Sequence, residues 1–136
     1  MTIAIFTILL AALMPIVCAG IAKYGMFSKH PREGGFDNRN PRDWLAKQEG
    51  YRKWANAAQQ NCWEALPFFA SAVIVNHILG GAGITANLLA ITFIVLRALF
   101  VYLYVTGKQA MRSLVWVFAL IINVALFFLS VVFQYL

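Results

Sequence analysis

The chain has 136 residues, of which 62% are hydrophobic and only 12% are charged, and its mean hydropathy is +0.73. An ordinary soluble domain is about 45–50% apolar and about 25% charged, and a domain this small leaves much of its surface in water. A soluble domain, a disordered chain and a nucleic-acid-binding protein are therefore excluded, although the net charge is +6. The composition predicts an integral protein of the lipid bilayer.

Long apolar segments predict an all-α membrane protein with four transmembrane helices. A helix needs about 20 apolar residues to cross the bilayer, whereas a transmembrane barrel has short alternating segments. Four such helices and one long loop account for a single domain over residues 1–136. We predict the spans at about 3–22, 57–79, 84–105 and 113–136.

The first span contains no charged residue. A cleaved signal peptide is the alternative interpretation, but no Lys or Arg precedes the apolar run, as a signal peptide requires. We therefore expect a retained helix.

Residues 23–56 form a polar loop that holds eight of the eleven Lys and Arg residues. Within it, residues 40–43 (Asn-Pro-Arg-Asp) have the order of a helix start, with an N-cap, a proline in the first turn and an acid three residues on. Trp44, Tyr51 and Ala55 follow at helical spacing, which predicts a helix that rises into the membrane interface. A solvated loop is the alternative.

The basic residues predict the orientation. Loop 23–56 and the connection 106–112 together hold ten Lys and Arg, and the connection between the second and third spans holds none. The positive-inside rule places both loops in the cytoplasm and both termini outside. The same charge suits contact with anionic lipid headgroups.

Two charged residues, Glu64 and Arg97, interrupt the predicted spans. Each would cost about 2.5–3.5 kcal/mol if it faced lipid near the bilayer centre. Counted from the cytoplasmic ends of their spans, they lie at depths of roughly 10 and 12 Å. We therefore expect them to face each other or to share a polar ligand.

Four further polar residues share helical faces with this pair or lie near it. Gln60 and Asn61 precede Glu64 by four and three residues on the second span, and Tyr104 follows Arg97 by seven residues on the third. Arg112 lies where the fourth span begins, beside a helix N-terminus that carries partial positive charge. The six residues predict a polar pocket open to the cytoplasm; the alternative is that they only hold helices together.

No metal site is expected, because His30 and His77 have no suitably spaced partner ligands. The two cysteines, Cys18 and Cys62, lie in apolar stretches and are expected to pack as small residues without a disulfide. Asn123 is expected to make a contact between helices or at the membrane interface.

Residues 59–68 resemble the MAPEG family, the membrane-associated proteins in eicosanoid and glutathione metabolism, in its bacterial, microsomal glutathione transferase-like branch. The second helix of that family carries Asn-x-x-Glu-x-x-Pro, which Asn61, Glu64 and Pro67 match. Residues 36–42 are similar to an Asn-Pro-rich loop of the same proteins.

The resemblance extends over nearly the whole chain, because Arg97, Tyr104 and Arg112 are similar to the Arg, Tyr and Arg positions on family helices three and four. It implies a homotrimer of four-helix subunits in a bacterial inner membrane. Glutathione would bind between adjacent subunits near the cytosolic face, as a co-substrate and without a metal. The second substrate would be a lipophilic electrophile or hydroperoxide dissolved in the bilayer.

Carried over residue by residue, the resemblance implies a role for each candidate. Glu64 would bind the ammonium of glutathione, Arg97 a carboxylate, and Tyr104 would donate a hydrogen bond. Arg112 would stabilise the thiolate, because a nearby cation lowers the pKa of a thiol and only the thiolate attacks. The substrate-binding candidates are thus Gln60, Asn61, Glu64, Arg97 and Tyr104, and the catalytic candidate is Arg112.

One position departs from the family pattern. Many of its transferases have Arg four residues before the motif Asn, where this chain has Ala57. This removes one carboxylate partner for glutathione unless Arg52 or Lys53 replaces it.

Three functions are considered for a membrane protein with these features. A glutathione transferase or peroxidase is favoured by Arg112 and by the pair Glu64 and Arg97. A non-catalytic MAPEG-like protein that binds a lipid or a partner is favoured by Ala57. A small proton-coupled exporter would use the membrane glutamate, but the long polar loop and Arg97 do not suit it.

Overall fold

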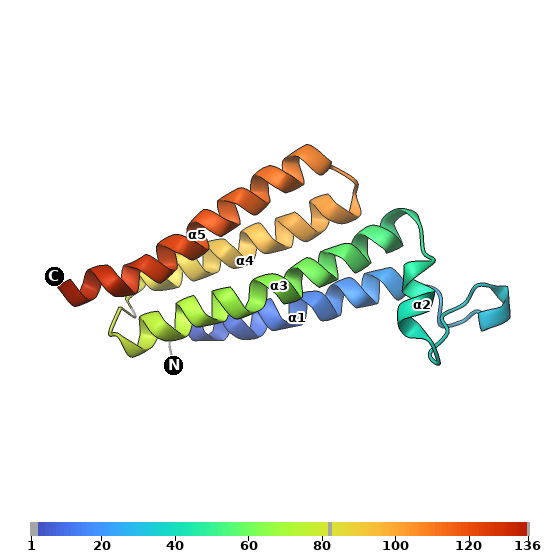
Figure 1. Cartoon of the computed structure of the whole chain (residues 1–136), viewed down its shortest axis with the longest axis horizontal. Coiled ribbons are helices and arrows are strands. Elements are labelled where there is room, and N and C mark those ends of the chain that lie inside the picture. Colours follow the sequence, from blue (N-terminus) through green and yellow to red (C-terminus); the bar gives the residue numbers. More distant parts are fainter. Residues whose placement is uncertain (1–2, 82, 136) are drawn as a thin grey trace.

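The computed structural model describes residues 3–81 and 83–135, and their side chains except at 130 and 133–135. Four long helices run side by side, and a short helix packs at one end of them (Figure 1). No strand occurs among the described residues. The helices are α1 (Ile3–Lys23), α2 (Pro41–Ala46), α3 (Gly50–Ile78), α4 (Ile84–Val105) and α5 (Gln109–Tyr135), with a single 3₁₀ turn at Pro31–Glu33.

Three helices in the described chain are long and apolar enough to cross a membrane, namely α1, α4 and residues 109–129 of α5. They correspond to the predicted first, third and fourth spans. The predicted second span is also helical, as part of α3, but α3 does not reach the same apolarity. Its first half carries charged and amide side chains, including Arg52, Lys53 and Glu64.

Two helices begin before the membrane spans predicted within them, because apolarity alone was used to place the spans. α3 begins seven residues before the expected position 57, and α5 begins four residues before position 113. A helix needs backbone hydrogen bonds and tolerates polar side chains such as Arg52, Lys53 and Gln109, so it continues beyond its apolar part. The charged ends of both helices therefore project past their apolar segments.

The predicted helix from residue 41 onward is two helices. Pro41 does occupy the first turn of α2, as expected, although the Asn40 side chain makes no capping hydrogen bond. α2 ends at Ala46, and α3 begins at Gly50, whose positive φ of 59° turns the chain between them. The expected single stripe of aromatic residues is therefore divided between two helices, with Trp44 on α2.

The polar segment 24–49 and the turn between α4 and α5 lie at the same end of the bundle (Figure 1). α1 begins and α5 ends at the opposite end, near the turn between α3 and α4. This arrangement gathers every Lys and Arg except Arg97 at one end of the molecule.

The core that unites the four helices is built mainly of small side chains. Small residues let helix backbones approach closely, which is the usual way that helices associate inside membranes. At the centre, the rings of Phe69 and Phe93 stack with centroids 4.1 Å apart and join α3 to α4. The buried alanines of this core are Ala4, Ala11, Ala72, Ala86, Ala90 and Ala119.

The polar segment between α1 and α3 has a small aromatic core of its own. The ring of Phe36 meets Trp44 and Phe27 edge-on, with centroids 5.3 and 5.2 Å away. The chain reaches this packing through Gly35, where a Cβ atom would overlap the carbonyl oxygen of Lys29. Only glycine fits at that position.

We predict that Gly35→Ala disorders the polar segment, because the added methyl group meets backbone that cannot give way, at a cost of about 1–3 kcal/mol. Limited proteolysis within residues 24–49 should become about ten-fold faster. Gly20→Ala on α1 is the matched control, since a Cβ there meets nothing within 4 Å. Equal cleavage rates for the two variants would contradict the packing described.

Candidate functional site

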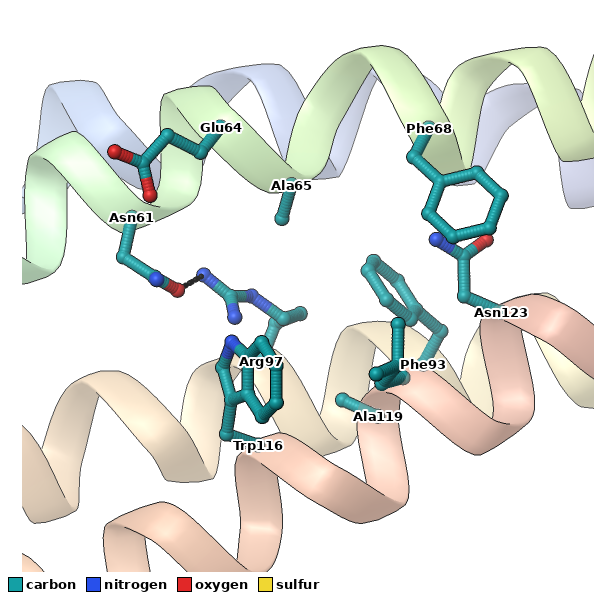
Figure 2. Close-up of a pocket in the computed structure, with 10 residues that line it drawn as sticks. Asn61, Glu64, Ala65, Phe68, Phe93, Arg97, Trp116, Ala119 and Asn123 are labelled. Carbon is teal, nitrogen blue, oxygen red and sulfur yellow. Dashed lines mark hydrogen bonds between the residues drawn. The ribbon is translucent and has the colours of Figure 1, made fainter.

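The facing sides of α3, α4 and α5 enclose a cavity of about 170 Å³, here called cavity A (Figure 2). Its polar lining comes from Asn61 and Glu64 of α3, Arg97 of α4, and Trp116 and Asn123 of α5. The rest of the lining is apolar and consists of Ala65, Phe68, Phe93, Ala119 and Leu120.

A second hollow of about 210 Å³, cavity B, adjoins cavity A, because Asn61 and Trp116 line both. It lies toward the α4–α5 turn, since Tyr104 comes from the last turn of α4 and Arg112 from the first turn of α5. Its complete lining is Asn61, Phe100, Tyr104, Arg112, Ser113 and Trp116. Five of the six candidates from the sequence thus line two adjoining cavities.

The Arg97 side chain is only 3% exposed. Its Nη2 donates to Oδ1 of Asn61 at 2.9 Å and to Sγ of Cys62 at 3.4 Å, and its guanidinium lies 4.4 Å from the ring centroid of Phe100. Within the described chain it makes no ion pair and its other N–H groups have no partner. A buried cation without an anion is costly, so this group is poised to take one.

Glu64 lines the same cavity as Arg97 but does not form the expected contact with it. Asn61 accepts the hydrogen bond instead (Figure 2). The Glu64 side chain remains exposed, and it too lacks a partner among the described residues. The two opposite charges are therefore both available to a ligand in cavity A.

Aromatic rings connect the two cationic residues. The Arg112 guanidinium lies 4.1 Å from the ring centroid of Tyr104, and that ring meets Phe100 edge-on at 5.4 Å. Ring faces hold guanidinium groups without neutralising their charge. Arg112 also lies in the first turn of α5, where the helix adds partial positive charge. Cavity B is therefore suited to an anion.

Three residues considered from the sequence lie away from both cavities. Gln60 sits about 100° around α3 from Asn61 and lines a separate surface hollow with Arg42 and Trp63. Arg52 donates to the carbonyl oxygen of Tyr24 at 3.2 Å, so it does not take the place of the arginine missing at position 57. Lys53 lines neither cavity.

Sequence reasoning missed three residues of the site. Cys62 was expected only to pack, yet it accepts a hydrogen bond from Arg97. Trp116 lines both cavities, and Asn123, expected to contact another helix, has an Oδ1 atom without a hydrogen-bond partner. Helical spacing held a signal, since positions 112, 116, 119 and 123 recur on one face of α5.

The helices and cavities define a membrane-type helical bundle with a cationic site among three of its helices. A model of the MAPEG family matches residues 3–132, and the chain belongs to that family. No curated protein matches the chain, and no solved structure does. The three apolar helices and the family fit an integral membrane protein, and membership supports a glutathione-related function at the family level. The bacterial branch stays a prediction.

We predict that Arg97→Met leaves the free energy of unfolding within about 1 kcal/mol of the wild-type value or raises it, because an apolar side chain removes an unneutralised buried charge. Asn61→Leu should instead destabilise the protein by about 1–3 kcal/mol, because it leaves the guanidinium without its acceptor. Thermal unfolding in detergent without ligand measures both. A larger loss in Arg97→Met than in Asn61→Leu would contradict this view of the site.

Proposed function

We propose that the protein is an integral membrane glutathione transferase or peroxidase that acts on lipophilic electrophiles. The observation that carries the proposal is a pair of guanidiniums, Arg97 and Arg112, that line adjoining cavities without anionic partners in the described chain. Glutathione supplies two carboxylates, one ammonium and one thiol. With Glu64 as the single acid, the site offers opposite charges to one carboxylate, to the ammonium and to the thiolate.

Each charged side chain of the site is assigned one group of glutathione in this proposal. Arg97 pairs with a carboxylate of glutathione through the N–H groups that Asn61 and Cys62 leave free. Glu64 binds the ammonium as the group of opposite charge on the exposed side of cavity A. The Tyr104 phenol donates a hydrogen bond to the peptide.

Arg112 is the proposed catalytic residue. Its guanidinium and the N-terminus of α5 favour the thiolate form of glutathione over the thiol. The thiolate sulfur then bonds to the electrophilic carbon of the second substrate, and the leaving group departs with the bonding electrons. With a hydroperoxide, two glutathione molecules are oxidised to the disulfide while the hydroperoxide is reduced to an alcohol and water.

The surroundings support a bilayer setting and a homotrimer. Apolar side chains are exposed along α1, α4 and α5, and α3 lies beside α1, so we propose that α3 crosses the membrane with them. The basic end then faces the cytoplasm. Each cavity is smaller than the 300–1,000 Å³ typical of ligand pockets, so an adjacent subunit is proposed to complete the glutathione site.

A non-catalytic MAPEG-like protein that binds a lipid or a partner is the second candidate. It is favoured by Ala57 and by the engagement of Arg52 with Tyr24, which together leave the second glutathione carboxylate without an obvious partner. A proton-coupled exporter is disfavoured, because Glu64 shares its cavity with Arg97.

We predict that the purified protein binds glutathione and shows the ultraviolet absorbance of its thiolate. Arg112→Ala should keep binding but lose this absorbance, and the conjugation rate should fall about 10²-fold, as when one stabilising group of a transition state is removed. Lys108→Ala is the matched control, because it removes a basic side chain at the same end that lines neither cavity.

Two outcomes would reject the transferase. Absence of glutathione binding at millimolar concentration, in protein shown to be trimeric, would exclude it. Tight binding without thiolate formation in the wild-type protein would favour the non-catalytic candidate.

A further inference from the structure

Asn123 is a polar group of cavity A that glutathione binding does not explain. Its side chain is 3% exposed, its Oδ1 has no hydrogen-bond partner, and Asn123 makes no other hydrogen bond within the part of the chain that is described. It lies on α5, one of the most apolar helices. A buried amide that stays unpaired among apolar groups is unfavourable, so its presence calls for a partner.

The position of Asn123 gives cavity A two polar ends. Figure 2 shows Asn61 and Arg97 at one end, Asn123 at the other, and Phe93 and Ala119 between them. The seven residues of α5 from Trp116 to Asn123 correspond to a rise of about 10 Å. The cavity is therefore a short apolar slot with a cation and amide at one end and a lone amide at the other.

One ordinary partner for this amide is absent from the described chain, and two others are disfavoured by the lining of cavity A. A neighbouring helix does not supply one, because no described residue bonds to it. A second subunit would not reach a side chain that is 3% exposed without entering the cavity. A buried water needs two to four polar partners, and the lining beside Asn123 is formed by Phe68, Ala119 and Leu120.

We propose that cavity A binds a small lipophilic molecule that carries one hydroxyl group, such as a phenol, with the hydroxyl donating to Oδ1 of Asn123. The apolar body lies between Phe68, Phe93 and Ala119. A volume of about 170 Å³ accommodates one aromatic ring, since a dry protein cavity of about 150 Å³ binds benzene. The other end of the molecule faces Arg97. The binding of this molecule is proposed for the protein without glutathione and does not rest on the proposed function.

The test compares para-cresol and toluene, which differ only in the hydroxyl group, as competitors of a fluorescence quencher. Para-bromophenol quenches tryptophan fluorescence, and the part of the quenching that Trp116→Phe removes reports on the two cavities that Trp116 lines. The part that Ala119→Leu also removes reports on cavity A, because Ala119 lines cavity A and not cavity B. Para-cresol and toluene then compete with it, each corrected for partition into detergent, in the absence of glutathione. Para-cresol should displace the quencher at about a five-fold lower concentration than toluene, the effect of one neutral hydrogen bond.

Two variants decide the origin of this preference. Asn123→Leu should make the two competitors equal, and Ala119→Leu, which fills the cavity, should weaken both by about ten-fold. An unchanged preference in Asn123→Leu, or unchanged affinities in Ala119→Leu, would overturn the proposal. If Asn123→Leu does not fold, Ala119→Leu still decides. Because glutathione is absent throughout, a failure of glutathione binding would be a separate result.

Discussion

The site depends on a buried guanidinium that the protein holds in place and does not neutralise. Arg97 is fixed by Asn61, by Cys62 and by the ring of Phe100, and none of these is an aspartate or glutamate side chain. Replacing a buried charge by an apolar side chain is often neutral or stabilising, so stability alone does not account for such a residue. In the function proposed here, this charge binds an anion that enters the adjoining cavities.

The rest of the bundle makes this arrangement possible. The alanine-rich core lets α3 approach α4 closely, and the stacked rings of Phe69 and Phe93 fix the two helices next to the cavity. The short turn between α4 and α5 then returns Arg112 toward Tyr104. Charged side chains are thereby kept beside an apolar slot, as the proposed reaction of a polar thiol with a lipophilic molecule requires.

Much of this could be predicted from the sequence. Apolar runs located α1, α4 and α5, and the depths of Glu64 and Arg97 placed both on one cavity. Apolarity did not reveal that α3 begins in charged sequence or that Gly50 separates it from α2, because helices extend as far as their backbone hydrogen bonds allow. The choice of Asn61 over Glu64 as the acceptor for Arg97 depends on side-chain direction, which spacing along a helix does not resolve. For the same reason Gln60, four residues from Glu64, turned out to face another hollow.

The central claim is that Arg97 is kept unpaired in order to bind a carboxylate. It is tested most directly by comparing the affinities of glutathione and its diethyl ester, in which both carboxylates are neutral, for the wild-type protein and Arg97→Met. The account predicts that the substitution weakens glutathione binding by about 30-fold and leaves binding of the diester nearly unchanged. An equal loss of affinity for both compounds would contradict it, because the guanidinium would then act on something other than carboxylate charge.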